Sequence, residues 1–348
     1  MIFMQKTLII LTPGFPADES DSNCLPAQQQ FVVMLQENFP GLQIIIVTVQ
    51  YPAFGKDYLW NHIRVISLNI QKGFYTRFAW IKIWNTLKKL KDENSISGLV
   101  IFWCSAHALP AFWLARTYHI PHYCWILGQD ARKNNRVVKL IRPKPQELIA
   151  ISDALQNEFY ENHGVKAAHV IPVGVNKNSF GACTGGRFID ILGAGSLIPL
   201  KQYHLFVEIV KSLSSCFPDL KALLFGRGTE KEMLQKKIRQ LHISHNLKLM
   251  DEISHDELVA VMHHGKIFLH PSAYEGFSSA CLEALSAGAH VISFQRPMER
   301  DLPHWHTVNS TYEMYLMTLR LLQSDLLDHE EIIPYSMNSA TKQIMALF

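Results

Sequence analysis

The sequence predicts an α/β protein made of two doubly wound domains, each with a parallel sheet covered by helices. Strand-like and helix-like runs alternate throughout the 348 residues. The strand-like runs are apolar without polar alternation, as expected when both faces of a parallel sheet are buried. A segment rich in Gly and Asn, 174–186, separates the two halves and has the composition of a linker.

The elements follow in order along the chain. We expect strands in the first half at Thr7–Thr12, Leu42–Val49, Leu99–Cys104, His122–Leu127, Leu148–Ser152 and His169–Val173. Helices between them include Pro26–Asn38, Arg77–Lys91, Leu109–Tyr118 and Asp153–His163. We expect strands in the second half at Phe188–Gly193, Lys221–Phe225, Leu247–Met250, Ile267–His270 and His290–Phe294. A last helical segment, Met337–Phe348, follows Pro334.

Bulk properties restrict the class of protein. The length suits two domains rather than one core. Hydrophobic residues make up 48% and charged residues 18%, which is typical of a globular chain. No apolar run reaches membrane-spanning length. The first residues lack the basic region and the cleavage site of a signal peptide, so we interpret them as a strand. Six scattered Cys residues without a C-x-x-C pair favour a reducing cytoplasm.

The net charge of +3 is uneven along the chain. Residues 1–180 have 18 Lys and Arg against 12 Asp and Glu, whereas residues 181–348 have 15 against 18. The first half is therefore the more suitable partner for anions. Nucleic acid is not expected as a partner, because the overall charge is low and no known nucleic-acid-binding module is present.

Two carboxylates, Glu275 and Glu283, lie eight residues apart with Gly and Ser between them. A strand precedes this stretch, and a helix followed by a second strand comes after it, which predicts a βαβ unit with a ligand at the strand's carboxyl end. We expect the helix to begin near Ser278 or Ser279, because Ser is a good N-cap. Its free N–H groups would suit a diphosphate. A solvated Glu pair is the alternative, since the bare spacing is common.

The wider phrase is more specific. Residues 270–288, His-Pro-Ser-Ala-Tyr-Glu-Gly-Phe-Ser-Ser-Ala-Cys-Leu-Glu-Ala-Leu-Ser-Ala-Gly, resemble the donor-site signature of retaining glycosyltransferases of family 4, which have the GT-B fold. The resemblance implies that Glu283 hydrogen-bonds a ribose and Glu275 a sugar hydroxyl. It also implies that backbone N–H groups meet the sugar and the phosphate, from Gly276, Phe277, Ser278, Ser279 and Ala280.

Two loops in the second half extend this resemblance. Residues 193–201 are similar to the family's Gly-Arg-Leu…Lys loop, in which Arg and Lys bind the donor diphosphate. Lys201 matches the Lys, but Ser196 stands where Arg is usual. Residues 225–230 match a short Gly-x-Gly loop, whose glycines would let the backbone approach a ligand. Arg227 would replace the missing positive charge, unless it is an exposed Arg in a turn.

The first half offers fewer matches. Gly128-Gln-Asp130 resembles the family's Gly-x-Asp, but Leu127 occupies the position of the preceding His. Asp130 either holds an acceptor hydroxyl or caps a turn. His107 is a candidate for facing the acceptor, with a structural histidine as the alternative. Gly14, after the first strand, would let its loop approach the donor phosphate.

Two basic stretches remain. In Arg77–Lys91, apolar residues including Trp80 and Trp84 form one helical face and basic residues the other, so this helix either packs on its own domain or rests on an anionic membrane. Residues 132–144 contain six bases and no acid. Of these, Arg132 and Lys133 directly follow the Gly-x-Asp stretch and are candidates for binding a phosphorylated or lipid-phosphate acceptor, with a merely solvated basic stretch as the alternative.

The sequence therefore predicts a two-domain GT-B glycosyltransferase that uses a UDP- or GDP-linked sugar, retains configuration and serves polysaccharide synthesis. Residues 1–175 would bind a glycan, a lipid-linked or another hydroxyl acceptor, with 335–348 returning to them, and residues 186–330 would bind the donor. Glu275, Lys201 and Asp130 are the predicted catalytic residues. No metal or other cofactor is expected. A cytoplasmic location, peripheral at the inner membrane face if the basic helix rests there, is expected. The alternatives are a non-catalytic sugar-nucleotide-binding subunit and an epimerase of the same fold.

Overall fold

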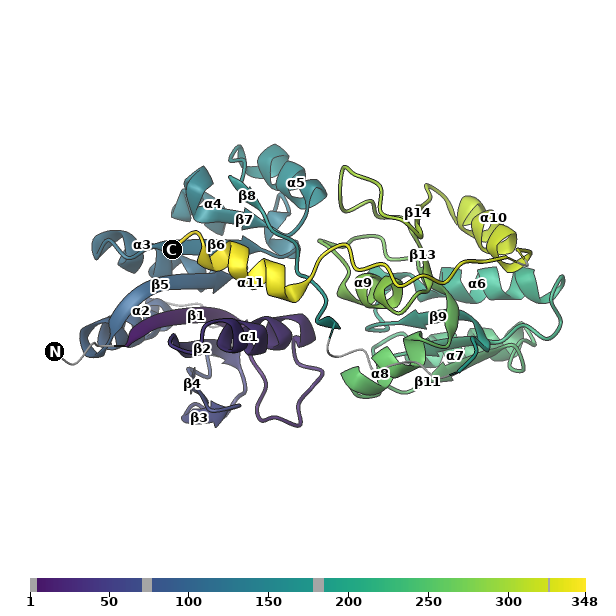
Figure 1. The fold of residues 1–348 in the computed structure, drawn as a ribbon, viewed down its shortest axis with the longest axis horizontal. Coiled ribbons are helices and arrows are strands. Elements are labelled where there is room, and N and C mark those ends of the chain that lie inside the picture. Colours follow the sequence, from purple (N-terminus) through teal and green to yellow (C-terminus); the bar gives the residue numbers. More distant parts are fainter. Residues whose placement is uncertain (1–4, 71–76, 178–184, 325) are drawn as a thin grey trace. The chain divides into compact units, whose positions relative to one another are not determined.

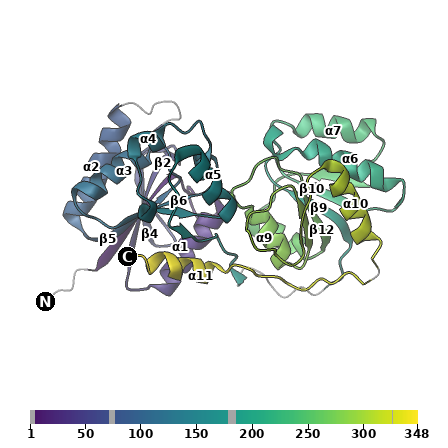
Figure 2. The ribbon, with the colours of Figure 1, turned by 90° about the horizontal axis from the view of Figure 1, so that it is seen from above.

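The computed structural model describes residues 5–70, 77–177, 185–324 and 326–348. The chain divides into two compact units, Met1–Gly174 with Met337–Phe348, and Val175–Ser336 (Figure 1). Each unit contains one twisted sheet with helices packed around it (Figure 2). The predicted doubly wound α/β architecture is confirmed.

The first unit contains an eight-stranded sheet in the order β3-β4-β2-β1-β5-β6-β7-β8. All neighbouring strands are parallel except the β3–β4 pair. The central strand β1 is buried along Leu8–Leu11, as its unbroken apolar run predicts. The strands are β1 (Lys6–Gly14), β2 (Gln43–Tyr51), β3 (Asp57–Trp60), β4 (Ile63–Ser67), β5 (Ser95–Phe102), β6 (His122–Ile126), β7 (Leu148–Ala150) and β8 (His169–Val170).

The helices of the first unit largely follow the predicted ranges. They are α1 (Pro26–Asn38), α2 (Arg77–Glu93), α3 (Ala108–Thr117), α4 (Val137–Ile141), α5 (Asp153–His163) and α11 (Met337–Met345). Ser152 accepts a hydrogen bond from the backbone N–H of Leu155 and so caps α5. Because Ser152 is the cap, β7 ends two residues earlier than predicted. Gly164 ends the same helix with φ 73°, a backbone conformation that favours Gly.

Several short elements were not predicted. The strands β3 and β4 form a hairpin whose turn residues, Asn61 and His62, both have positive φ. Asn favours such turns, but the strands are too short for their periodicity to stand out. The helix α4 and the strand β14 (Trp305–Thr307) were missed for the same reason of length.

The second unit contains a six-stranded sheet, entirely parallel, in the order β11-β10-β9-β12-β13-β14. Its other strands are β9 (Ile189–Ala194), β10 (Ala222–Phe225), β11 (Leu247–Met250), β12 (Gly265–His270) and β13 (His290–Ser293). Its helices are α6 (Tyr203–Ser214), α7 (Lys231–Gln240), α8 (His255–Met262), α9 (Ser279–Ser286) and α10 (Thr311–Leu322). The order reverses next to β9, so the loops after β9 and β12 diverge at a topological switch point, where ligands of such sheets bind.

The last helix, α11, packs on the first unit beside α1 (Figure 1). The side-chain amide of Asn38 donates to the hydroxyl of Thr341 at 2.8 Å. Phe348 packs edge-on against Tyr123 and lies so close to Gly98 that a Cβ at that glycine would clash with its ring. The predicted return of the C-terminal helix to the first domain is confirmed.

Candidate functional site

In the second unit, two loops are hydrogen-bonded to each other at the carboxyl ends of β9 and β12. The backbone N–H of Ala273, in the loop after β12, donates to the carbonyl of Leu200 at 2.9 Å. The next residue, Lys201, ends a short 3-10 helix begun by Pro199. This contact places the side chain of Lys201 next to Glu275, although the two residues are 74 positions apart.

Glu275 is held by two donors that share one of its oxygens. Lys201 donates from Nζ to Oε1, and His270, the last residue of β12, contacts the same oxygen through Nε2 at 2.9 Å. Burial alone would raise the pKa of Glu275, but the His270 hydrogen bond and the Lys201 charge lower it to about 2. Burial lowers the pKa of His270, so its ring is neutral and donates through Nε2. Glu275 is therefore an ionised acceptor over the whole physiological pH range.

Glu283 has a separate histidine partner. Its Oε1 lies 2.9 Å from Nε2 of His255, the first residue of α8, and both side chains are buried. Burial opposes protonation of His255, but the hydrogen bond and charge of Glu283, with the charge of Asp256, raise its pKa. Glu283 is thus paired with His255, whose protonated form is favoured, whereas Glu275 is paired with the neutral ring of His270.

The helix α9 begins where the sequence predicted. Ser278 is its N-cap, and its hydroxyl accepts from the backbone N–H of Cys281 at 3.3 Å. Gly276, Phe277 and Ser278 are buried, whereas Ser279 and Ala280 are half-buried at the helix's amino end. The ring of Phe277 packs edge-on against Trp305 and Tyr335, so this side chain fixes the turn. The contacts predicted for these backbone N–H groups with sugar and phosphate stay predictions.

The Gly-x-Gly loop packs against the backbone of the loop after β9. A Cβ at Gly226 would lie 2.0 Å from the carbonyl oxygen of Gly195, and one at Gly228 would lie 2.3 Å from that of Leu197. Both glycines also have positive φ. The backbone N–H of Leu197 donates to the carbonyl of Arg227 at 2.9 Å. The glycines therefore let this loop pack on the Gly195–Leu197 backbone; their approach to a ligand is not needed to explain them.

Arg227 and Ser196 both lie on the surface. The side chain of Arg227 is 80% exposed and pairs with Glu252 at 3.0 Å, which matches the exposed-turn alternative for this residue. Ser196 is exposed on the loop after β9. Of the three candidates Ser196, Lys201 and Arg227, it is Lys201 that donates to Glu275.

Asp130, in the first unit, is hydrogen-bonded to its own backbone surroundings. It is buried, and its carboxylate accepts from the N–H groups of Cys104 at 2.8 Å, Gly128 at 2.8 Å and Leu127 at 3.2 Å. Burial raises its pKa to about 6, against the opposing effect of these amide donors. Of the two predicted alternatives for Asp130, this arrangement matches the turn cap. It gives no support to a catalytic role.

The other first-unit candidates differ in exposure. His107 is fully buried, with Nδ1 contacting the Ser105 hydroxyl and Nε2 the Phe102 carbonyl, both at 2.8 Å. Burial lowers its pKa to about 4. The prediction that His107 faces an acceptor is wrong for this structure, because no atom of it is exposed. Arg132 is half-buried and Lys133 exposed, and Gly14 ends β1 beside Tyr51. Acceptor and donor contacts of these three stay predictions.

Sequence reasoning missed His255 and His270 as site residues. His270 ends the strand that leads to Glu275, so its position in the phrase could have indicated it. His255 comes from a different helix, and no local spacing links it to Glu283. Among the described residues, no group of three or more His, Cys, Asp and Glu side chains is arranged to hold a metal ion.

Sequence comparison matches residues 186–303 to the family described as glycosyl transferases group 1. Glycogen synthase of Mycobacterium tuberculosis is 25% identical over 240 residues, which cover 62% of this chain and 56% of that protein. The 2-deoxystreptamine N-acetyl-D-glucosaminyltransferase of Niallia circulans is 29% identical over 103 residues, 30% of this chain and 26% of that protein. The chain thus spans about half, or less, of the length of these relatives.

Solved structures share the fold over nearly the whole chain. Sucrose-phosphate synthase from Thermosynechococcus elongatus superposes with a TM-score of 0.67 at 17% identity, covering 99% of this chain and 95% of that one. Anabaena HepE, crystallised with UDP and glucose, gives 0.68 at 16% identity, covering 98% and 95%. These likenesses confirm the GT-B fold. The family match is confined to the second unit.

Proposed function

We propose that the protein transfers a sugar from a nucleotide-sugar donor to a hydroxyl acceptor with retention of configuration, as family-4 enzymes do. One observation carries the proposal. In the second unit, Lys201, Glu275 and the amino end of α9 gather at the carboxyl ends of β9 and β12, within the segment that matches glycosyl transferases group 1. A cation, a fixed carboxylate and free helix amides suit a diphosphate joined to a sugar.

In the proposed complex, Glu283 accepts from the ribose and Glu275 from a sugar hydroxyl, while the first turn of α9 faces the diphosphate. Lys201 already pairs with Glu275. We expect donor binding to redirect the Lys201 ammonium towards the diphosphate and to give Glu275 the sugar hydroxyl instead. As the bond from the anomeric carbon to the diphosphate breaks, negative charge grows on the leaving oxygen, and Lys201 stabilises it. The acceptor oxygen then bonds to the anomeric carbon on the same face of the sugar, and the hydroxyl proton passes to the departing diphosphate oxygen.

The proposed acceptor class draws on the names of relatives. Relatives of the matched segment include transferases named for acceptors as different as 2-deoxystreptamine and phosphatidylinositol. We propose that residues 1–175 bind the acceptor, which is a glycan, a lipid-linked molecule or another hydroxyl compound. We propose that residues 186–330 bind a UDP- or GDP-linked donor and that the reaction needs no metal. The product would serve polysaccharide synthesis. A lipid-linked acceptor would bring the protein to the surface of an anionic membrane.

A panel of UDP- and GDP-linked sugars, screened for a rise in melting temperature, tests the donor site. We expect one nucleotide class to raise it, and Glu283→Ala to remove that rise because the ribose loses its acceptor. Stabilisation that survives Glu283→Ala contradicts the ribose role. Product analysis with and without a sugar acceptor then separates transfer from epimerisation. Binding without turnover of any acceptor would favour the non-catalytic subunit.

A further inference from the structure

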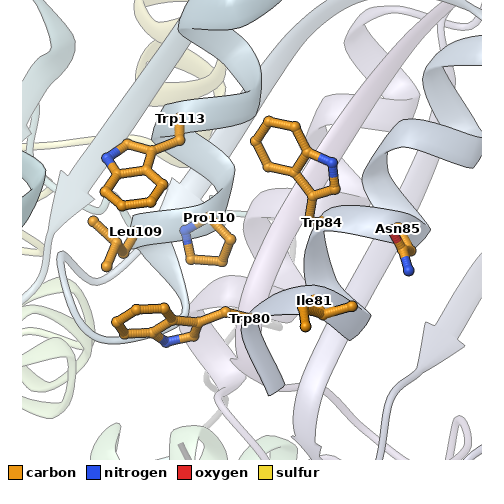
Figure 3. A pocket seen from close by; sticks show the side chains of 7 residues that line it. All are labelled: Trp80, Ile81, Trp84, Asn85, Leu109, Pro110 and Trp113. Atoms are coloured by element: carbon orange, nitrogen blue, oxygen red, sulfur yellow. The ribbon is translucent and has the colours of Figure 1, made fainter. Parts of the chain in front are cut away.

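A pocket of about 310 Å³ opens between α2 and α3 of the first unit (Figure 3). Its lining is almost entirely apolar and includes three tryptophans. The residues are Trp80, Ile81, Trp84 and Asn85 from α2, and Leu109, Pro110 and Trp113 from α3. In the close-up, the rings of Trp80, Trp84 and Trp113 surround Pro110 and Leu109. Nothing proposed above for donor or acceptor uses this pocket.

Only some of the apolar side chains of α2 are buried in the core of the first unit. Ala79, Ile83, Leu87 and Leu90 are buried, so the predicted packing of the apolar face on its own domain is confirmed for these four. Trp80 and Trp84, predicted on the same face, instead lie half-buried in the pocket wall. Beyond them, Phe78 is 82% exposed and Ile81 54% exposed.

The neighbouring helices continue this surface. α3 lies between α2 and α4, and the three helices adjoin in Figure 2. α3 exposes Trp113, and α4 exposes Leu140. Isolated exposed apolar residues are ordinary, but four large ones on adjoining helices, two of which (Ile81 and Trp113) line an apolar pocket, indicate an interaction surface. We call this surface, with the bases described next, the α2–α3–α4 face.

The same face concentrates positive charge. α2 contains five bases against two acids, α3 one base, and residues 128–147 six bases against two acids. This excess of eight positive charges exceeds the +3 of the whole chain, so the remainder is net negative. Lys88, Arg136 and Lys139 are exposed. Exposed aromatics among lysines and arginines match the interface of an anionic bilayer, where aromatic rings lie at headgroup depth and bases meet lipid phosphates.

We propose that the α2–α3–α4 face docks on an anionic phospholipid bilayer, and that the tryptophan pocket takes up part of a lipid's hydrocarbon chain. The excess of positive charge favours a phosphate-rich surface over an apolar patch of another protein. The volume of the pocket is within the range of small-ligand sites, which suits part of a hydrocarbon chain. The inference does not depend on the proposed transferase activity, because docking needs neither donor nor acceptor.

Vesicle sedimentation tests the docking. We expect the protein to sediment with vesicles of equal parts phosphatidylcholine and phosphatidylglycerol, to stay in solution with phosphatidylcholine alone, and to dissociate as salt rises. The triple change Lys88→Gln, Arg136→Gln and Lys139→Gln should lower partitioning on the order of 100-fold, about fivefold per charge. The control changes Lys236→Gln, Arg239→Gln and Lys248→Gln remove the same charge from exposed positions of the second unit and should have no such effect.

A second pair of variants tests the apolar part. Phe78→Ser with Ile81→Ser should weaken partitioning more than tenfold, whereas Tyr312→Ser, on an exposed position of α10, should not. In the unaltered protein, phosphatidylglycerol brominated on its acyl chains should quench tryptophan fluorescence. The proposal is overturned if both charge variants bind alike, if acyl bromine leaves the fluorescence unchanged, or if Phe78→Ser with Ile81→Ser converts a dimer into a monomer, which would make the face a self-association surface.

Discussion

The two units bury carboxylates near the carboxyl ends of their strands, but they hold them in different ways. Asp130 in the first unit accepts from three backbone N–H groups, which cannot move without unfolding the turn. Glu275 in the second unit accepts from the side chains of Lys201 and His270. Side-chain donors can change partner when a ligand arrives, whereas backbone donors cannot. The hydrogen bonds of Asp130 therefore hold a turn of the fold, whereas those of Glu275 come from side chains that can exchange partners.

The largest expected effect comes from Glu275→Gln. We expect turnover to fall on the order of 100-fold or more, because a fixed charge in a largely buried site is lost and Lys201 loses its partner. Product formation from the donor identified in the panel measures the effect. Glu252→Gln is the matched control, since it makes the same chemical change on the surface of the same unit. Equal activity in the two variants would remove Glu275 from the reaction.

Asp130→Ala should instead act on stability. It leaves three buried N–H groups without an acceptor, which we expect to lower the free energy of unfolding by about 2–4 kcal/mol. Urea denaturation measures the change, and nucleotide affinity should stay the same. A variant with unchanged stability but much slower turnover would restore Asp130 as a catalytic residue.

The histidines of the two units should respond to pH in opposite directions. His107 has a folded-state pKa of about 4, below its unfolded value of about 6.5. The unfolded chain therefore takes up a proton first, and stability falls as pH drops between these values, by up to about 1.4 kcal/mol per unit. The pKa of His255 is raised, so its contribution is present below the unfolded pKa and is lost as pH rises through the folded one.

Urea denaturation as a function of pH separates the two histidines. His107→Gln should flatten the loss of stability on the acid side, and His255→Gln should remove stabilisation that the unaltered protein has on that side. If His255→Gln lowers stability equally at all pH values, His255 is not protonated when paired with Glu283.

The smallest effect is expected for Arg227→Ala. Its side chain is mostly exposed and its ion pair with Glu252 lies at the surface, where such pairs contribute about 0–1 kcal/mol. Donor affinity should change less than about twofold, a difference within the smallest effects expected of surface residues. A tenfold loss, measured by titration calorimetry, would return Arg227 to the diphosphate site.

The long regular elements could be predicted from the sequence because their signals are local. The helices α1 and α5 have the predicted bounds, and the start of α9 follows from Ser278 as its cap. The hairpin of β3 and β4 could not, since its strands are short and only two residues, Asn61 and His62, connect them. Length and capping chemistry thus separate the elements that were found from those that were missed.

The candidate site was predictable only in part. The phrase around Glu275 indicated both carboxylates, but their histidine partners depend on tertiary contacts: His255 comes from α8, and Lys201 reaches Glu275 only through the contact of Ala273 with Leu200. In the Gly-x-Gly loop, the sequence pattern suggested one neighbour and the structure shows another. Glycines suggested a ligand nearby, yet a neighbouring backbone explains them. A glycine in a loop indicates that another group approaches the backbone closely, but it does not identify that group.

The return of α11 to the first unit has a consequence for synthesis on the ribosome. Ile344, Ala340 and Met337 are buried, and Phe348 packs over Gly98. The amino-terminal half therefore leaves the exit tunnel with part of its interior uncovered, and it stays so until residues 337–348 have been translated. The second unit can complete its own core earlier, so a chaperone that protects the nascent chain would be needed chiefly by the part made first.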